Sequence, residues 1–238
     1  MHYDKIKTPL GRFFNRSIGL RKLFYWLLDL LLLRAWHVHS YLSHWRLVQG
    51  TSARILDAGS GFGQYSYYLA KKSKDYQILA LDVKEDQVAD CNQFFSKAGL
   101  TNVTFEVGDL VALDRENEFD LVLCVDVMEH IEEDVQVMTN YFRALKPGGM
   151  LLISTPSDQG GSDVNEDDDS SFIEEHVRDG YGLREIQKKL KTAGFILTEV
   201  HYQYGAPGKI SWKLSMKWPC LCFRKASCSS SSFRSITC

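Results

Sequence analysis

The stretch Ile55-Leu56-Asp57-Ala58-Gly59-Ser60-Gly61-Phe62-Gly63 decides the fold of this 238-residue chain. An apolar run leads into a turn with three glycines, and a helical pattern follows through about Lys72. Glycine permits a tight turn and lets a ligand approach the backbone closely. The following helix would present free N–H groups at its start. The pattern predicts a strand over 53–58 with a nucleotide-like ligand above the turn.

Strand-like and helix-like patterns then alternate along the chain. Short apolar segments predict strands, and segments with helical spacing predict helices between them. Such alternation implies a parallel sheet with right-handed crossovers and helices on both faces. Strands are predicted at 77–81, 103–107, 119–125, 150–154 and 195–204, and helices at 85–98, 133–145 and 183–193. A turn is predicted at 146–149, and the strict alternation over 209–218 predicts a last, antiparallel strand.

Three carboxylates accompany these strands. Asp57 stands two residues before the first glycine, Asp82 ends the second strand and Asp109 follows the third. The glycine spacing is G-x-G-x-G, not the G-x-G-x-x-G that seats a pyrophosphate. A carboxylate beside this turn suits a cationic amino-acid group, Asp82 can accept ribose hydroxyls, and Asp109 can accept an exocyclic amine. Any one of these carboxylates could be an ordinary turn or helix-cap residue. Together, after three successive strands, they would line one edge of the sheet.

The ordered motifs DAGSGFG, LALDV, VGDL, FDLVLCVDVMEHI and LKPGGMLLIS resemble those of the class I S-adenosylmethionine-dependent methyltransferases. The similarity covers about residues 50–200 and is strongest to the small-molecule branch that includes the ubiquinone and menaquinone biosynthesis methyltransferases. It implies an α/β, Rossmann-like sheet of seven strands, mostly parallel with the last strand antiparallel, and S-adenosylmethionine as the cofactor. An N-terminal helical extension precedes that sheet.

The resemblance also implies roles for individual residues. Those in and before the glycine turn would hold the methionine moiety, and those at the next strand ends would bind the adenosine. The first group is Asp57, Gly59, Gly61 and Gly63; the second is Asp82 for the ribose, Val83 beside the adenine, Asp109 and the backbone of Leu110 for the adenine edge, and Val125 for a backbone contact.

Methyl transfer from a sulfonium is an in-line displacement with an activated donor, so the protein mainly positions the reactants and excludes water. A base helps when the acceptor is a hydroxyl. His130 follows the fourth strand and is the first choice, with a structural histidine as the alternative. Glu175, His176 and Tyr181 are weaker candidates, in or after a polar stretch (156–180) expected to cover a small-molecule acceptor. No metal site is predicted, because Asp168 stands where a calcium loop needs glycine.

Composition and charge set further limits. The net charge of −2 argues against a nucleic-acid binder, yet residues 1–22 and 205–238 are strongly basic. Such ends suit an anionic partner such as a membrane face, or are simply solvated. We expect a helical extension over 1–50, a methyltransferase domain over 51–218 and a Ser/Cys-rich tail over 219–238. Cys91 and Cys124 are expected in the core, and without a secretory pattern the expected location is cytoplasmic.

The most apolar run, residues 23–33, is interrupted by Asp29 and flanked by basic residues. It is too short to span a bilayer. We expect a helix that lies on the protein's own core, covers the active site or rests on a membrane, with peripheral membrane contact through residues 17–46.

Several functions remain open from the residues alone. The leading hypothesis is methyl transfer to a small, hydrophobic or lipid/quinone-like acceptor, with a polar metabolite as the alternative. A nicotinamide dehydrogenase is disfavoured by the glycine spacing and Asp57. A nucleic-acid methyltransferase would carry an Asn/Asp-Pro-Pro-aromatic run where this chain has Asp126-Val-Met-Glu. A non-catalytic binding module would be expected to lack one of the cofactor carboxylates, but Asp57, Asp82 and Asp109 are all present.

Overall fold

The computed structural model describes residues 17–159, 177–178, 180–196 and 198–203. Within them, five parallel strands form one sheet in the order β3-β2-β1-β4-β5. The strands are β1 (Ala53–Ala58), β2 (Tyr76–Asp82), β3 (Val103–Val107), β4 (Phe119–Val125) and β5 (Leu145–Ser154). The strand order reverses between β1 and β4, and open α/β sheets bind ligands at the carboxyl ends of strands beside such a reversal.

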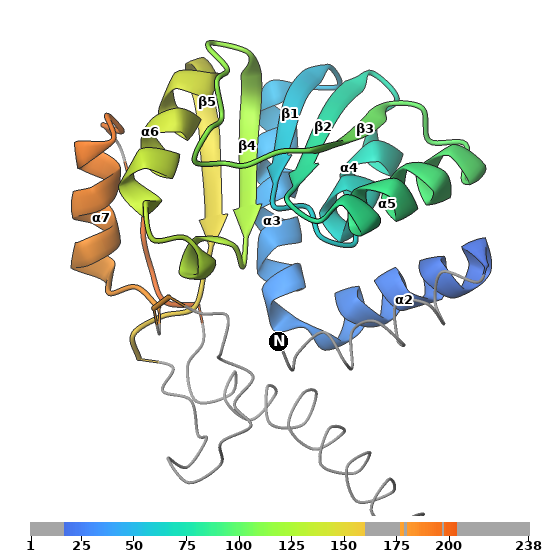
Figure 1. The fold of residues 1–238 in the computed structure, drawn as a ribbon, viewed down its shortest axis with the longest axis horizontal. Coiled ribbons are helices and arrows are strands. Elements are labelled where there is room, and N and C mark those ends of the chain that lie inside the picture. Colours follow the sequence, from blue (N-terminus) through green and yellow to red (C-terminus); the bar gives the residue numbers. More distant parts are fainter. Residues whose placement is uncertain (1–16, 160–176, 179, 197, 204–238) are drawn as a thin grey trace, which may run out of the picture.

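Helices cover both faces of this sheet (Figure 1). One face packs against α2 (Ile18–Leu31), α3 (Leu33–Gln49), α4 (Gln64–Lys72) and α5 (Glu85–Lys97). The other face packs against α6 (Asp134–Ala144) and α7 (Leu183–Thr192). A short 3-10 turn, η1 (Met128–His130), follows β4. The predicted α/β architecture with a parallel sheet is therefore confirmed.

Strand β4 runs through the middle of the molecule, and residues 121–124 have no solvent exposure. Helices on both faces explain why its sequence is a continuous apolar run and not an alternating one. Cys124 in this strand and Cys91 in α5 are buried free thiols, as predicted. Burial raises the pKa of both thiols to about 12, so neither is reactive at neutral pH.

The predicted bounds of β1, β3 and β4 are confirmed, and those of β2, α5, α6 and α7 are correct to within one residue. The expected separate turn at 146–149 is wrong, because these residues lie inside β5. Leu145 pairs with Phe119 and Met150 pairs with Leu121, so the residues between them bulge out of the ladder. Gly148, with φ of 80°, supplies the left-handed residue for this bulge.

The predicted strand at 195–204 is also wrong wherever the structure describes it, since residues 195, 196 and 198–203 form no strand. Side chains hold this segment instead. Phe195 packs edge-on against Phe142, and the hydroxyl of Tyr202 donates to Asp158 at 2.7 Å. The predicted antiparallel strand at 209–218 lies outside the described residues, so seven strands remain a prediction.

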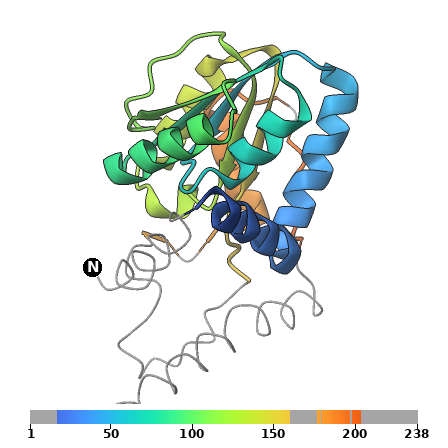
Figure 2. The ribbon, with the colours of Figure 1, turned by 90° about the vertical axis from the view of Figure 1, so that its right-hand side faces the viewer.

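The apolar run near the N-terminus forms two helices, with a break at Leu32 in extended conformation (φ −95°, ψ 108°). Helix α3 stands beside the sheet, and α2 crosses beneath its lower edge (Figure 2). Tyr25, Val38, Leu42 and Trp45 of these helices share one core with the sheet. Within the described residues, no helix is long and apolar enough to cross a membrane.

Candidate cofactor site

The glycine turn joins β1 to α4 at the carboxyl edge of the sheet. Gly59, Gly61 and Gly63 have φ of 76°, 49° and 74°, which is the left-handed region that favours glycine. The backbone N–H groups of Gly59 and Ser60 donate to the carbonyl of Leu81 at 2.9 and 2.8 Å. These bonds tie the turn to the end of the neighbouring strand β2.

The three glycines differ in what a side chain at each position would contact. A Cβ at Gly59 would lie 2.3 Å from a methyl group of Val127, and one at Gly63 would lie 2.9 Å from the ring of Phe105. At Gly61 a Cβ would meet nothing within 4 Å. Gly59 and Gly63 therefore allow the protein to pack on itself. Gly61 is the glycine with open space above it, where a ligand can approach the backbone.

Asp82, at the end of β2, is the carboxylate closest to that open space. It accepts hydrogen bonds from the backbone N–H of Gly61 at 2.8 Å and of Lys84 at 2.9 Å. The side chain is only partly buried, so each oxygen keeps a lone pair for an incoming hydroxyl. Val83 beside it is exposed, as a residue that contacts a ligand ring must be. Their contacts with the ribose and the adenine stay predictions.

Asp57 lies deeper than the sequence suggests. Its side chain is buried and accepts a hydrogen bond from the hydroxyl of Ser66 in α4 at 2.6 Å. Burial raises the pKa of Asp57 from 3.8 to about 6, against the effect of the Ser66 bond. Asp57 therefore anchors α4 beneath the turn, and its contact with a methionine group stays a prediction.

The remaining predicted cofactor residues lie at the same edge. Asp109 is exposed and accepts from the backbone N–H of Val111 at 2.9 Å. The Leu110 side chain is buried, and its backbone carbonyl accepts from the side-chain amide of Asn140 at 3.0 Å. Val125 ends β4 and is followed by Asp126, whose φ of 53° is unusual for a residue other than glycine. Such a conformation is costly and tends to occur at functional sites.

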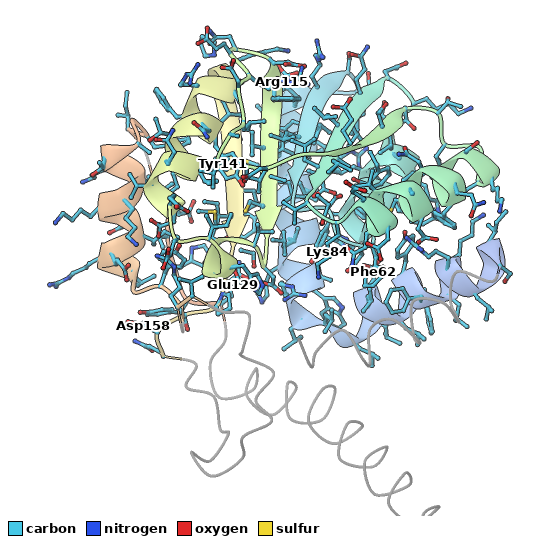
Figure 3. The ribbon with its side chains drawn as sticks, in the orientation of Figure 1. Phe62, Lys84, Arg115, Glu129, Tyr141 and Asp158 are labelled. Carbon is cyan, nitrogen blue, oxygen red and sulfur yellow. The ribbon has the colours of Figure 1, made fainter. Side chains whose placement is uncertain are left out.

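Two contacts that the sequence did not reveal come from α2. The buried guanidinium of Arg21 donates to the carbonyl of Phe62 at 3.0 Å, and the hydroxyl of Tyr25 donates to the same carbonyl at 2.5 Å. Arg21 also pairs with Asp90 of α5. Figure 3 shows Phe62 at the carboxyl edge, beside α2. Arg21 belongs to the basic segment 1–22, but the helix turns it inward, one turn before Tyr25, so it does not add to a basic surface.

The α2–α3 pair makes two further contacts with this edge. Gln64, the first residue of α4, donates to Asp29 of α2 at 2.6 Å. Arg34 of α3 pairs with Asp126 after β4. Together with the Phe62 contacts, these bonds fix the helix pair across the ends of β1 and β4. The N-terminal helices thus border the site and belong to it.

His130, the predicted base, is exposed, and its backbone N–H donates to the carbonyl of Val127. Its neighbour Glu129 is the residue that turns inward. Glu129 is 1% exposed and its carboxylate accepts from the hydroxyl of Thr155 at 3.1 Å. Figure 3 places Glu129 at the carboxyl edge, below β4. The MEH sequence contains both residues, but only the 3-10 turn decides which one is buried.

Tyr181 is not available as a base. Its hydroxyl is buried and donates to Asp134 at 2.7 Å, and burial together with this carboxylate raises its pKa. Arg178 and Lys189 pair with the same carboxylate, so the cluster joins Arg178, Tyr181 and α7 to α6. Glu175, His176 and the acidic stretch around Asp168 lie outside the described residues. Among the residues that are described, no group of three potential ligands could hold a metal ion.

A hollow of about 800 Å³ opens at the opposite edge, where the strands begin. Its two arginines pair with one carboxylate: Arg54 donates to Glu118 at 2.6 Å, and Arg115 lies 3.5 Å from the same side chain. Figure 3 shows Arg115 at this edge, far from Phe62 and Glu129. None of the predicted cofactor residues lines the hollow, so it does not belong to the candidate site.

Comparison with known proteins agrees with this arrangement. A family model described as a methyltransferase domain matches residues 50–193. Phosphoethanolamine N-methyltransferase 1 of Triticum aestivum is 30% identical over 146 residues, which are 60% of this chain and 28% of that protein. A ubiquinone biosynthesis O-methyltransferase of Methylococcus capsulatus is 30% identical over 103 residues, 43% of each chain. The chain thus spans less than half the length of these curated relatives.

Among solved structures, phosphoethanolamine N-methyltransferase 2 of Haemonchus contortus in complex with S-adenosyl-L-methionine is similar, with a TM-score of 0.54 and 27% identity. The match covers 61% of this chain and 34% of that one. The family model covers more than half of the chain, and the parallel sheet, glycine turn and strand-end carboxylates are those expected from the sequence motifs. The chain therefore belongs to the methyltransferase domain family, within the class I S-adenosylmethionine-dependent methyltransferases.

Proposed function

We propose that this chain binds S-adenosylmethionine across the carboxyl ends of β1, β2 and β3 and transfers its methyl group to a small acceptor. The observation that carries the proposal is the open space above Gly61 next to the partly buried carboxylate of Asp82. A backbone that can be approached closely and a carboxylate with free lone pairs are what an adenosine with an amino-acid end requires. The family match supports the same cofactor.

Each residue of the site then has a specific task. Asp82 accepts the ribose hydroxyls, Val83 packs beside the adenine, and Asp109 with the backbone of Leu110 accepts and donates at the adenine edge. The turn around Gly61 accommodates the methionine moiety. The α2–α3 pair, held on the turn by Arg21, excludes water from this edge.

The bound cofactor supplies an activated methyl group on a sulfonium, so the chain needs to contribute little covalent chemistry. Its residues orient the acceptor in line with the methyl group and keep water away. Where the acceptor atom is a hydroxyl, a base removes its proton. His130 is the candidate base, and the buried carboxylate of Glu129 is a second group on the same turn.

We infer a hydrophobic or lipid/quinone-like acceptor. The support is the concentration of exposed apolar side chains on α2, next to the candidate site, together with the relatives named for ubiquinone biosynthesis. A polar amine is the second candidate, because other relatives are named for phosphoethanolamine. Product mass spectrometry with labelled cofactor and a panel of quinones, phenols, lipids and small amines separates the two. Label only in polar amines would overturn the hydrophobic acceptor.

The cofactor site is tested by Asp82→Asn. This change keeps one oxygen to accept a backbone N–H but removes the charge that favours the ribose hydroxyls. We expect S-adenosylmethionine to bind at least about ten-fold more weakly, as for loss of a charge-assisted hydrogen bond. Isothermal titration calorimetry measures the affinity.

The matched control is Asp75→Asn, an exposed carboxylate just before the other end of β2. It should leave the affinity unchanged. An Asp82→Asn variant that folds and binds as tightly as the control would show that Asp82 does not bind the cofactor.

A further inference from the structure

Helix α2 buries Arg21 and Tyr25 against the domain and leaves several large apolar side chains exposed on its other side. Arg21 is 1% exposed, whereas Leu23, Trp26 and Leu30 are 45%, 58% and 48% exposed. Their spacing of three and four residues places the three apolar side chains on one stripe of the helix. A helix that only covers a soluble domain normally carries polar and charged side chains on its outer face, not a stripe of large apolar ones.

The inward contacts fix this orientation. The Arg21 guanidinium donates to the carbonyl of Phe62 and to the Cys91 sulfur, and pairs with Asp90. Rotating α2 to bury its leucines would strip these partners from a buried cation, which is strongly unfavourable. The apolar stripe therefore faces outward as a fixed property of the fold.

The exposed surface continues past the end of α2. Leu31 and Trp36 are about half exposed, and the indole N–H of Trp36 donates to the carbonyl of Asp29 at 2.5 Å, which holds the ring at the α2–α3 junction. The outer apolar face is the set Leu23, Trp26, Leu30, Leu31 and Trp36. A concentration of large apolar side chains of this kind marks an interaction site.

We propose that the outer apolar face docks on the surface of an anionic phospholipid bilayer. The charges of α2 and of the sequence that precedes it favour this partner. Lys22 is the exposed charged side chain of α2, because Asp29 turns to the amide of Gln64. The sixteen residues that precede Ser17 contain four cationic side chains and one acidic one (Lys5, Lys7, Arg12, Arg16 and Asp4). Leucines and tryptophans beside cations are the composition of helices that lie in a lipid interface.

The position of α2 is compatible with docking. The helix lies along the lower edge of the molecule, below the carboxyl ends of β1 to β3, and its far side faces away from the sheet (Figure 1). A flat surface can therefore reach the stripe without meeting the sheet. Docking through this face is independent of which acceptor the site takes.

Vesicle co-sedimentation of the full chain tests the proposal. We expect it to bind phosphatidylcholine vesicles that contain about one third phosphatidylglycerol, and to bind pure phosphatidylcholine about ten-fold more weakly. The double variant Trp26→Ser/Leu30→Ser should bind the anionic vesicles at least about ten-fold more weakly than the unaltered chain.

The matched control is Leu47→Ser/Val48→Ser, which removes two apolar side chains that are 84% and 90% exposed at the other end of the helix pair. It should bind vesicles like the unaltered chain. Circular dichroism confirms folding of both double variants. Should Trp26→Ser/Leu30→Ser not fold, Lys22→Glu changes only an exposed charge and should lower the affinity for anionic vesicles about ten-fold, with no effect on neutral ones.

Failure of the unaltered chain to bind anionic vesicles would overturn the proposal, and so would equal loss of binding in both double variants. A third outcome also overturns it: a dimer, seen by sedimentation equilibrium, that the Trp26 and Leu30 substitutions dissociate. That result would make a second copy of this chain the partner of the outer apolar face.

Discussion

Gly61 and Gly99 form a natural pair for testing the site at the scale of single residues. Both have left-handed φ, 49° and 71°, and a Cβ at either would meet no atom within 4 Å. Alanine at either position should therefore lower the free energy of unfolding by about 1 kcal/mol, the usual strain of that conformation. Only Gly61→Ala should also weaken S-adenosylmethionine binding, by more than about ten-fold, because its methyl group enters the cofactor's space.

Chemical denaturation and titration calorimetry measure the two effects. Gly99→Ala, at the end of α5, reports the strain alone. Equal cofactor affinities for the two variants would remove Gly61 from the site.

Asp57 makes stability depend on pH. Its pKa is raised from 3.8 to about 6 by burial, so the folded state binds more protons than the unfolded state between these values. The free energy of unfolding should therefore fall by about 2 kcal/mol as pH rises from 4 to 6. Asp57→Asn, which keeps an acceptor for the Ser66 hydroxyl, should remove this component.

Urea denaturation of both proteins across this pH range measures the difference. Parallel pH profiles for the two proteins would show that Asp57 is not the titrating group.

Residues at strand ends could be predicted from the sequence because each follows an apolar run of defined length. Asp82 and Asp109 are examples, and the structure places both at the carboxyl edge. Side chains whose orientation depends on a turn or on a distant partner could not be predicted from the sequence. Glu129 and His130 are adjacent in the 3-10 turn, yet Glu129 is buried and His130 is exposed. Arg21 is buried because Phe62, Asp90 and Cys91 converge on it, and no local pattern contains that information.

At the scale of elements, α2 acts on the glycine turn through Arg21. Arg21→Met should lower the free energy of unfolding by about 3 kcal/mol, because the Asp90 carboxylate and the Phe62 carbonyl lose a buried partner. It should also weaken S-adenosylmethionine binding about ten-fold, since the turn is no longer held in place. Thermal unfolding and calorimetry measure both quantities.

Lys22→Met is the matched control, with the same chemical change at the adjacent exposed position. It should leave both quantities close to those of the unaltered chain. If Arg21→Met lost stability but kept full cofactor affinity, the contact with Phe62 would be structural alone.

The elements themselves were largely predictable. Alternating apolar runs and helical spacing identified five strands and the helices α4 to α7, because burial on both faces of a parallel sheet leaves a strong pattern. The bulge in β5 was not predictable. Pro147 and Gly148 signal a turn, but pairing of Leu145 with Phe119 keeps them within the strand. The apolar residues after α7 predict a strand, but Phe195 packs on Phe142 of α6 and does not pair with the sheet.

At the scale of the whole molecule, the two edges of the sheet differ. The carboxyl edge combines an open glycine turn, a partly buried carboxylate and a helix pair fixed across it. The opposite edge has a hollow whose arginines, Arg54 and Arg115, are already paired with Glu118. Methyl transfer needs a dry site that positions two reactants, and only the first edge has the parts to provide one. The location of the site thus follows from topology, whereas the acceptor depends on side chains beyond the sheet.

The hydrogen bond from Arg21 to Phe62 ties α2 to the domain, and this affects where the protein can be truncated. The family match starts at residue 50, but the core includes Tyr25, Val38 and Leu42, which come earlier in the chain. A fragment that starts at residue 50 would expose the apolar surface beneath α2 and α3 and leave Asp90 without its cation. The segment that the family model matches is therefore shorter than the segment that shares this core.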